Sequence, residues 1–311
     1  MSALSETARE QLEKTEGRGL RDIAGIFQRL VPQNVFKSAA EGDMLGMIFF
    51  SLLFGYFLAR LSEENRGPLL SIFRGLYDVM LLITDLVMRF APIGVFALVA
   101  KVVATTGLDA FRQVAMFFVT VLAALAVHTF VVLPLLLRFV GRVNPVRHFQ
   151  AMTPALLTAF STASSSATLP LTMECVEKRA GVSNRTSSFV LPLGATVNMD
   201  GTALYECVAA LFIAQWYGVE LGFVAQFTVV LVALLTSIGV AGIPAASLVA
   251  IVIVLNAVGL PAEGIGLILA VERVLDMCRT SVNIFSDSCG AVIIGRSEGE
   301  TGILQTPEAK T

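Results

Sequence analysis

A stripe of polar side chains inside an apolar segment near the C-terminus constrains this chain more than any other feature. Asp276, Arg279, Asn283 and Asp287 follow the spacing i, i+3, i+7 and i+11. At about 100° per residue, this spacing places all four within an arc of roughly 80° on one face of a helix. A charge at the middle of a bilayer costs on the order of 3 kcal/mol or more. The stripe must therefore face a polar cavity, and the chain must fold so as to enclose one.

The composition is that of a membrane protein. Of the 311 residues, 55% are hydrophobic and only 15% are charged, and the mean hydropathy is +0.77, whereas a soluble domain is about 25% charged. Long apolar runs recur, so we predict an all-α, multi-pass integral protein of the plasma (inner) membrane, surrounded by membrane lipid. The net charge of −2 gives no reason to expect a nucleic-acid partner. The four cysteines are scattered through apolar segments and form no metal or disulfide pattern.

The apolar runs and the breaks between them divide the chain into four parts. We expect a polar N-terminal segment at residues 1–35, scaffold helices at 36–103, a core at 108–296 and a polar tail at 297–311.

Three segments of the core are apolar but interrupted. Ser-, Gly- and Pro-rich stretches split two of them into halves too short for a bilayer, which needs about 20 residues. We therefore predict a re-entrant hairpin at about 148–180, broken at 161–170, and another at about 221–260, broken at 237–244. The third segment, residues 188–216, is long enough to span but is interrupted at 194–202, which predicts a broken helix.

Basic residues predict the orientation of the two hairpins. Arginines and lysines flank the first hairpin, whereas the loops on either side of the second carry none. Cytoplasmic loops are the ones enriched in Lys and Arg, so the hairpins should enter the membrane from opposite faces. Broken segments in corresponding positions are typical of a transporter's binding site at the membrane midplane.

The side chains of the stripe suggest two kinds of ligand. Arg279 can hold a carboxylate with two hydrogen bonds, and Asp276 can bind an amino group, which together suit glutamate or aspartate. The alternative is an internal ion pair that only steadies the helix. Asp287 and Asn283, with backbone carbonyls freed near the break at residues 194–202, offer oxygen ligands for a small cation. The alternative for Asp287, as for Asp200, is a protonated carboxyl and proton coupling.

Other polar residues are less specific. The hydroxyls and N–H groups of residues 164–166 would attract an anion if they lie at a hairpin tip, although serine runs are often linkers. His128 is interpreted as an internal helix residue, because no acid lies one helical turn away. We expect no enzyme, because Gly-x-Ser-x-Gly is missing and only His128 and His148 could act as bases. A channel is not expected either. It would need a pore ring and no alternating gates, whereas two opposed hairpins are predicted here.

These residues resemble the glutamate/aspartate transporters of the sodium:dicarboxylate symporter family. The resemblance covers about residues 30–296 and rests on four motifs in family order, at 164–170, 198–202, 242–244 and 276–283. It implies a glutamate-transporter-like fold and a homotrimer in which residues 108–296 form a transport core that moves like an elevator. It also implies a secondary active symporter that carries an acidic amino acid with Na+. A C4-dicarboxylate symporter and a proton-coupled symporter remain alternatives.

The resemblance also implies roles for individual residues. The side-chain carboxylate of the substrate would bind Arg279, and its amino group would bind Asp276. The rest of the substrate pocket would be formed by Ser164, Ser165, Thr202, Ile243, Pro244, Ser247, Thr280 and Asn283. One sodium ion would use Gly194, Asn198, Asn283 and Asp287; a second would use backbone carbonyls of Thr196, Met199, Ser237, Ile238 and Val240; a third would use Asn198 and Asp200.

Two departures from the family pattern accompany this resemblance. The family has three further helices before Met44, where this sequence is polar, so a non-transporting, N-terminally truncated fragment is another alternative. The family also often carries a second arginine at one of two positions that are Ala163 and Met277 here. Arg273 lies one turn before Met277, and whether it compensates for the second arginine is left open.

Overall fold

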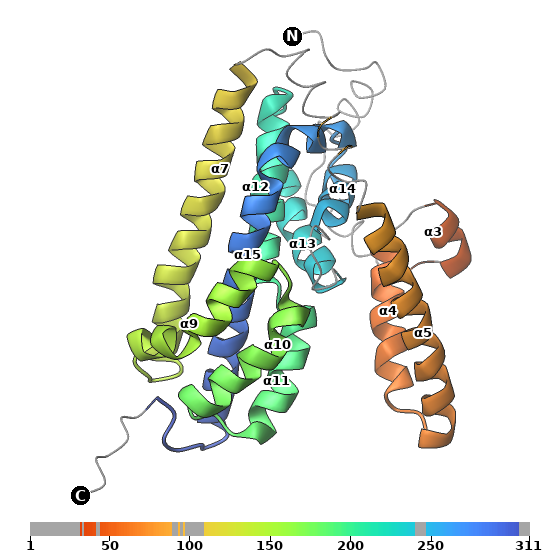
Figure 1. Ribbon diagram of the computed structural model, residues 1–311. Coiled ribbons are helices and arrows are strands. Elements are labelled where there is room, and N and C mark those ends of the chain that lie inside the picture. Colours follow the sequence, from red (N-terminus) through yellow and green to blue (C-terminus); the bar gives the residue numbers. More distant parts are fainter. Residues whose placement is uncertain are drawn as a thin grey trace, which may run out of the picture.

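The computed structural model describes residues 32, 34–41, 44–88, 93, 96, 109–239 and 247–304. The ordered elements of this part of the chain are helices, in agreement with the predicted all-α class (Figure 1). They are α3 (Val35–Glu41), α4 (Met44–Leu58), α5 (Glu63–Met88), α7 (Asp109–Val127), η1 (His128–Val132), α8 (Leu133–Phe139), α9 (Pro145–Thr162), α10 (Ser165–Glu174), η2 (Cys175–Arg179), α11 (Asn184–Val197), α12 (Asp200–Trp216), α13 (Phe223–Gly239), α14 (Ser247–Ala257), η3 (Ala262–Gly264) and α15 (Ile265–Ser297).

Local sequence signals set the ends of the helices in the first predicted hairpin. The side chain of Asn144 caps α9 by accepting the backbone N–H of Val146 at 2.9 Å, and Pro145 begins that helix. α9 ends at Thr162, the next residue, Ala163, has a left-handed φ of 51°, and Ser164 then caps α10. The break is therefore only two residues long, narrower than the predicted 161–170, and α9 and α10 pack against each other.

Helix α15 lies at the centre of the fold and joins two hydrophobic cores (Figure 1). Its N-terminal half packs with α7, α12, α13 and α14 around buried residues such as Tyr205 and Ile251. Its C-terminal half packs with α8, α9 and α11 around residues such as Met152 and Phe285. The polar stripe of α15 is thus carried by a helix that is packed along most of its length.

The basic loops gather at one end of this core, together with the C-terminal segment (Figure 1). The backbone N–H of Leu304 donates to Ala180 at 2.8 Å, and the guanidinium of Arg147 donates to the carbonyl of Leu304 at 3.2 Å. Glu300 accepts hydrogen bonds from Ser183 and Thr186 at the start of α11. The loop before α15 lies at the opposite end, where the Cα of Gly264 comes so close to Ile213 that a Cβ would be 2.5 Å from it.

The outward faces of several helices are apolar, as expected for contact with lipid. On α7 and η1, Met116 is 64% exposed and Phe130 is 68% exposed, and Leu82 on α5 is 71% exposed. Among the described residues, two helical stretches are long and apolar enough to cross a membrane, Arg112–Phe139 and Asn184–Trp216. Large exposed apolar surfaces of this kind mark contact with a membrane or a protein partner.

Candidate functional site

The polar stripe on α15 is buried, as predicted. Asp276, Arg279, Asn283 and Asp287 are 6%, 1%, 3% and 3% exposed. Because buried charges are costly unless they are paired and hydrogen-bonded, each of these side chains requires partners from neighbouring elements.

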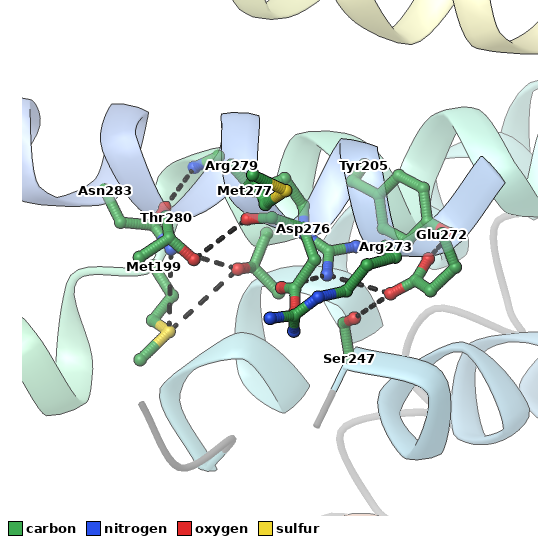
Figure 2. Close-up of polar contacts among 12 residues, drawn as sticks. Met199, Tyr205, Ser247, Glu272, Arg273, Asp276, Met277, Arg279, Thr280 and Asn283 are labelled. Atoms are coloured by element: carbon green, nitrogen blue, oxygen red, sulfur yellow. Dashed lines mark hydrogen bonds and ion pairs between the residues drawn. The ribbon is translucent and has the colours of Figure 1, made fainter. Parts of the chain in front are cut away.

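Arg279 is held by two carboxylates and an aromatic ring (Figure 2). Its Nη2 donates to Oδ1 of Asp276 at 2.6 Å and to Oε1 of Glu272 at 2.9 Å. Its guanidinium carbon lies 4.1 Å from the centre of the Tyr205 ring, within range of a cation–π interaction. Nε and Nη1 are buried and have no hydrogen-bond acceptor among the described residues. Nη2 of the guanidinium is therefore engaged, while the other two donor nitrogens are not.

Glu272 was missed by the sequence analysis. Its carboxylate is buried and accepts hydrogen bonds from the hydroxyl of Tyr205 on α12 and, at 3.2 Å, from that of Ser247 on α14. A signal was present, because Glu272 lies four residues before Asp276 and extends the same helical face by one turn. Glu206 was missed too; it is fully buried on α12, four residues after Thr202, and accepts a hydrogen bond from Thr236 at 2.8 Å.

The C-terminal half of the stripe, Asn283 and Asp287, lies against the break between α11 and α12. Only Asn198 and Met199 are non-helical, a shorter interruption than the predicted 194–202. The amide of Asn198 donates to Oδ1 of Asp287 at 2.9 Å and to the hydroxyl of Ser286 at 3.0 Å. The break thus brings an amide against the buried carboxylate of α15.

Asn283 joins the two helices just after the break. Its Oδ1 accepts the backbone N–H of Gly201 at 2.8 Å, and its Nδ2 donates to the hydroxyl of Thr202 at 3.1 Å and contacts the sulfur of Met199 at 3.7 Å. The expected freeing of the Gly194 carbonyl is wrong, because it accepts the backbone N–H of Asn198 at 2.8 Å. A carbonyl has two lone pairs, so this oxygen can still accept a second partner.

Glycine is required where α11 and α12 touch α15. A Cβ added to Gly194 would lie 2.6 Å from Oδ1 of Asp287, and one added to Gly201 would lie 2.9 Å from Oδ1 of Asn283. Both distances are shorter than real Cβ contacts, so a larger residue would displace the oxygen atoms of the site.

Several predicted residues use their hydroxyls within their own helices. Thr280 donates to the carbonyl of Asp276 at 2.9 Å, Ser237 donates to Leu234 at 2.9 Å, and Thr196 donates to Leu193 at 2.9 Å. Thr196 and Ser237 were expected to offer backbone carbonyls rather than hydroxyls, so those two roles stay predictions, as does that of Ile238.

The residues expected at the first hairpin tip lie at the start of α10. Ser164 accepts the backbone N–H of Ala167 at 3.2 Å, and Ser165 is 3% exposed. The expected ligands Val240, Ile243 and Pro244 lie outside the described residues.

His128 has an acidic partner that the sequence analysis did not find. Its Nε2 lies 2.6 Å from Oδ2 of Asp200, which is 72 residues away on α12. The prediction considered only acids one turn along the same helix, whereas the partner comes from another helix. The pair gives Asp200 a fixed position at the start of α12.

Comparison with known proteins identifies the family. The sequence profile described as the sodium:dicarboxylate symporter family matches residues 2–297. The chain belongs to this family of symporters. Members of this family are transporters rather than enzymes. Excitatory amino acid transporter 3 of Oryctolagus cuniculus is 46% identical to this chain over 300 residues, which are 93% of this chain and 57% of that protein.

Two further members of the family are similar to this chain. Excitatory amino acid transporter 3 of Mus musculus is 46% identical over 253 residues, 81% of this chain and 48% of the relative. The proton/sodium-glutamate symport protein of Geobacillus stearothermophilus is 38% identical over 300 residues, 94% of this chain and 70% of the relative. The chain spans about half the length of the excitatory amino acid transporters that it matches.

Proposed function

We propose that this protein contributes to the sodium-coupled uptake of an acidic amino acid, glutamate or aspartate. The upper half of the stripe, with Asp276 and Arg279, would bind the substrate, and the lower half, with Asn283 and Asp287, would bind a coupling sodium ion. Family membership and the relatives named as glutamate or amino-acid transporters support the transport of an acidic amino acid.

The observation that carries the substrate assignment is a buried guanidinium with two unpaired donor nitrogens. Nη2 of Arg279 is engaged by Glu272 and Asp276, but Nε and Nη1 are buried and have no acceptor among the described residues. Buried donors without partners cost about 1–3 kcal/mol each, more for charged groups. A carboxylate is a suitable acceptor for these donors, because hydrogen bonds from a guanidinium to a carboxylate are charge-assisted and strong. The existing contacts through Nη2 would hold the guanidinium in place.

The cation assignment follows from the oxygen atoms that surround the C-terminal half of the stripe. The carboxylate of Asp287, the amide oxygens of Asn198 and Asn283 and the carbonyl of Gly194 come from three segments that contact one another. Such oxygen donors suit small hard cations. Because Asn283 also bonds to Gly201 and Thr202, an ion placed here would order the break beside the substrate site. That shared element gives a physical route for coupling.

We further infer that α9–α10 and α13–α14 form re-entrant hairpins in a multi-pass protein of the plasma membrane, and that three copies assemble. The break at Ala163 and Ser164, the exposed apolar faces and the clustering of basic loops at one end support this arrangement. The sequence resemblance is the support for the trimer.

Uptake by proteoliposomes tests the proposal. The protein should accumulate labelled aspartate or glutamate under an inward sodium gradient and not when choline replaces sodium. Arg279→Cys should abolish this uptake, because the carboxylate of the substrate would lose the guanidinium that binds it. Equal uptake by the Arg279→Cys variant would refute the substrate assignment, and uptake driven by a proton gradient without sodium would refute the cation assignment.

A C4-dicarboxylate symporter is the alternative that the same assay distinguishes. A dicarboxylate has no amino group for Asp276 to bind, so Asp276→Asn should then leave uptake of succinate unchanged. If the substrate is an acidic amino acid, the same variant should lose uptake of aspartate.

A further inference from the structure

A hollow lies between helices α7 and α12, and no residue of the polar stripe lines it. Its volume is about 850 Å³, and the residues that line it come from 112–120 of α7 and 208–216 of α12. The two helices touch on one side of it, where the rings of Phe117 and Phe212 lie 4.8 Å apart. Sites that bind small molecules have volumes of about 300–1,000 Å³. The α7–α12 hollow is therefore large enough for a ligand.

The two ends of the α7–α12 hollow differ in polarity. Where α7 begins and α12 ends, the hollow is lined by Arg112, Gln215 and Trp216. Further along the two helices, it is lined by Phe117, Leu211 and Phe212. The polar end lies at the end of the fold opposite the basic loops (Figure 1). A ligand that matches this hollow has a polar group at one end and an apolar chain at the other.

Arg112 supplies the positive charge of the polar end. Its side chain is exposed, and it makes no ion pair or hydrogen bond with the described side chains. Gln215 on the opposite wall is also exposed. A guanidinium binds phosphate oxygens through charge-assisted hydrogen bonds. The polar end is thus complementary to an anionic headgroup.

The length of the α7–α12 hollow distinguishes a lipid chain from a protein helix. The lining positions on each helix span eight residues, which is about 12 Å at 1.5 Å per residue. One leaflet of the hydrocarbon core is about 15 Å deep, whereas a spanning helix needs about 30 Å. Met116, which lines the hollow, is 64% exposed on the apolar outer face of α7. The hollow therefore has the depth of one leaflet and is too short for a spanning helix.

We propose that the α7–α12 hollow binds a phospholipid with a negatively charged headgroup. Arg112 binds the phosphate, and one acyl chain packs along Phe117 and Phe212. Trp216 lies at the level of the headgroup, where tryptophan is enriched in membrane proteins. The lipid would bridge α7 and α12 at a place separate from the proposed substrate and cation sites, so this inference goes beyond the proposed function.

The single tryptophan of the chain reports on this site, because Trp216 lines the hollow. The purified protein is placed in phosphatidylcholine bilayers that contain brominated phosphatidylglycerol or brominated phosphatidylcholine, whose chains quench tryptophan fluorescence on contact. The quenching should show about fivefold tighter binding of phosphatidylglycerol, as expected for one arginine facing an anionic headgroup. Equal binding of the two lipids, or no quenching by either, would overturn the proposal.

Variants of Arg112 test the headgroup contact. Arg112→Gln should remove the preference for phosphatidylglycerol and leave the quenching by phosphatidylcholine unchanged, whereas Arg112→Lys should retain most of the preference. Arg138 on α8 is a matched control, since it is also an exposed arginine but lies far along the chain from the hollow. Arg138→Gln should keep the wild-type preference. If Arg112→Gln keeps it as well, the inference is wrong.

A further variant tests the hollow itself. Thr120 lines the apolar end and is exposed, so Thr120→Phe should fill the space without overpacking the core. It should lower the binding of phosphatidylglycerol to that of phosphatidylcholine although Arg112 is intact. An unchanged preference would place the lipid outside the hollow and contradict the proposal.

Two solution conditions complete the test. Inorganic phosphate should leave the wild-type preference as it is in chloride of equal ionic strength. Loss of the preference in phosphate alone would show that Arg112 binds the free ion instead of a lipid. The measurements need neither aspartate nor a sodium gradient, so their result stands even if the proposed function fails.

Discussion

Replacing Gly194 with alanine is a direct perturbation of the proposed cation site. The new Cβ would lie 2.6 Å from Oδ1 of Asp287 and 2.8 Å from its Cγ. Asp287 is 3% exposed and its side chain is short, so the carboxylate has little room to retreat. It must move by several tenths of an ångström, and its hydrogen bond with Asn198 must lengthen from 2.9 Å.

The size of the effect follows from two opposing contributions. Overpacking a buried contact costs about 1–3 kcal/mol, whereas alanine is favoured over glycine inside a helix by about 1 kcal/mol. Stability without sodium should therefore fall by at most about 2 kcal/mol. The distortion falls on a proposed ligand, so the sodium affinity should decrease by about tenfold to a hundredfold, or about 1.4–2.7 kcal/mol.

Sodium-dependent thermal unfolding of the purified protein measures both quantities. Ligand stabilisation grows as RT ln(1 + [L]/Kd), so at saturating sodium a tenfold weaker Kd removes about 1.4 kcal/mol of the sodium-linked stabilisation. Choline chloride at equal concentration separates this from a general effect of salt.

Gly290 provides the matched control. It also lies inside a helix, α15, and a Cβ there would meet nothing within 4 Å. Gly290→Ala should keep the full response to sodium and gain up to about 1 kcal/mol of stability from helix propensity. If Gly194→Ala responds to sodium as strongly as Gly290→Ala does, the cation site does not lie at Asp287.

Two further predictions concern the contacts around the stripe and the C-terminal segment. Tyr205→Phe removes the hydroxyl that donates to Glu272 but keeps the ring beside Arg279, so thermal unfolding should show a loss of about 1.5–3 kcal/mol. Tyr205→Leu should lose up to about 2 kcal/mol more with the cation–π contact, and equal stability of the two variants would contradict that contact's contribution. Burial raises the pKa of the Glu300 carboxyl, but hydrogen bonds from Ser183 and Thr186 outweigh it and hold the pKa below its usual 4.5. Because the folded-state pKa is the lower one, the stability from Glu300 is present above pH 4.5 and lost as the pH falls through the folded value. A pH series of unfolding temperatures should show this acid-side loss in the wild-type protein and less of it in Glu300→Gln; parallel curves would argue against it.

The sequence predicted the buried stripe because helical periodicity alone decides which side chains share a face. Asp276, Arg279, Asn283 and Asp287 needed no tertiary information to be placed together. The break at Asn198 and the turn at Ala163 were also predicted, although both are shorter than expected. The bounds of a short break are hard to predict from sequence. A helix can continue through Gly, Ser or Pro when neighbouring elements pack against it. Pro170, which lies inside α10, is an example.

The contacts that the sequence did not predict are those between side chains of different helices. Glu272 was within reach of a sequence argument, since it continues the stripe by one turn. Its partners Tyr205 and Ser247 were not, because they come from α12 and α14. The pairing of His128 with Asp200 spans 72 residues and was missed for the same reason. Spacing along the chain carries no information about which helices become neighbours.

By itself, then, the sequence determined that this chain is apolar and helical, and that one helix carries charges which must be buried together. The free energy of exposing a charge to lipid imposes that much on any fold the chain adopts. Only the tertiary structure decided how those charges are partnered. Nη2 of Arg279 is engaged while Nε and Nη1 are not, and Gly194 lets α11 touch Asp287. Those outcomes depend on distances between atoms of different helices, which are set by how the side chains of the whole core fill space.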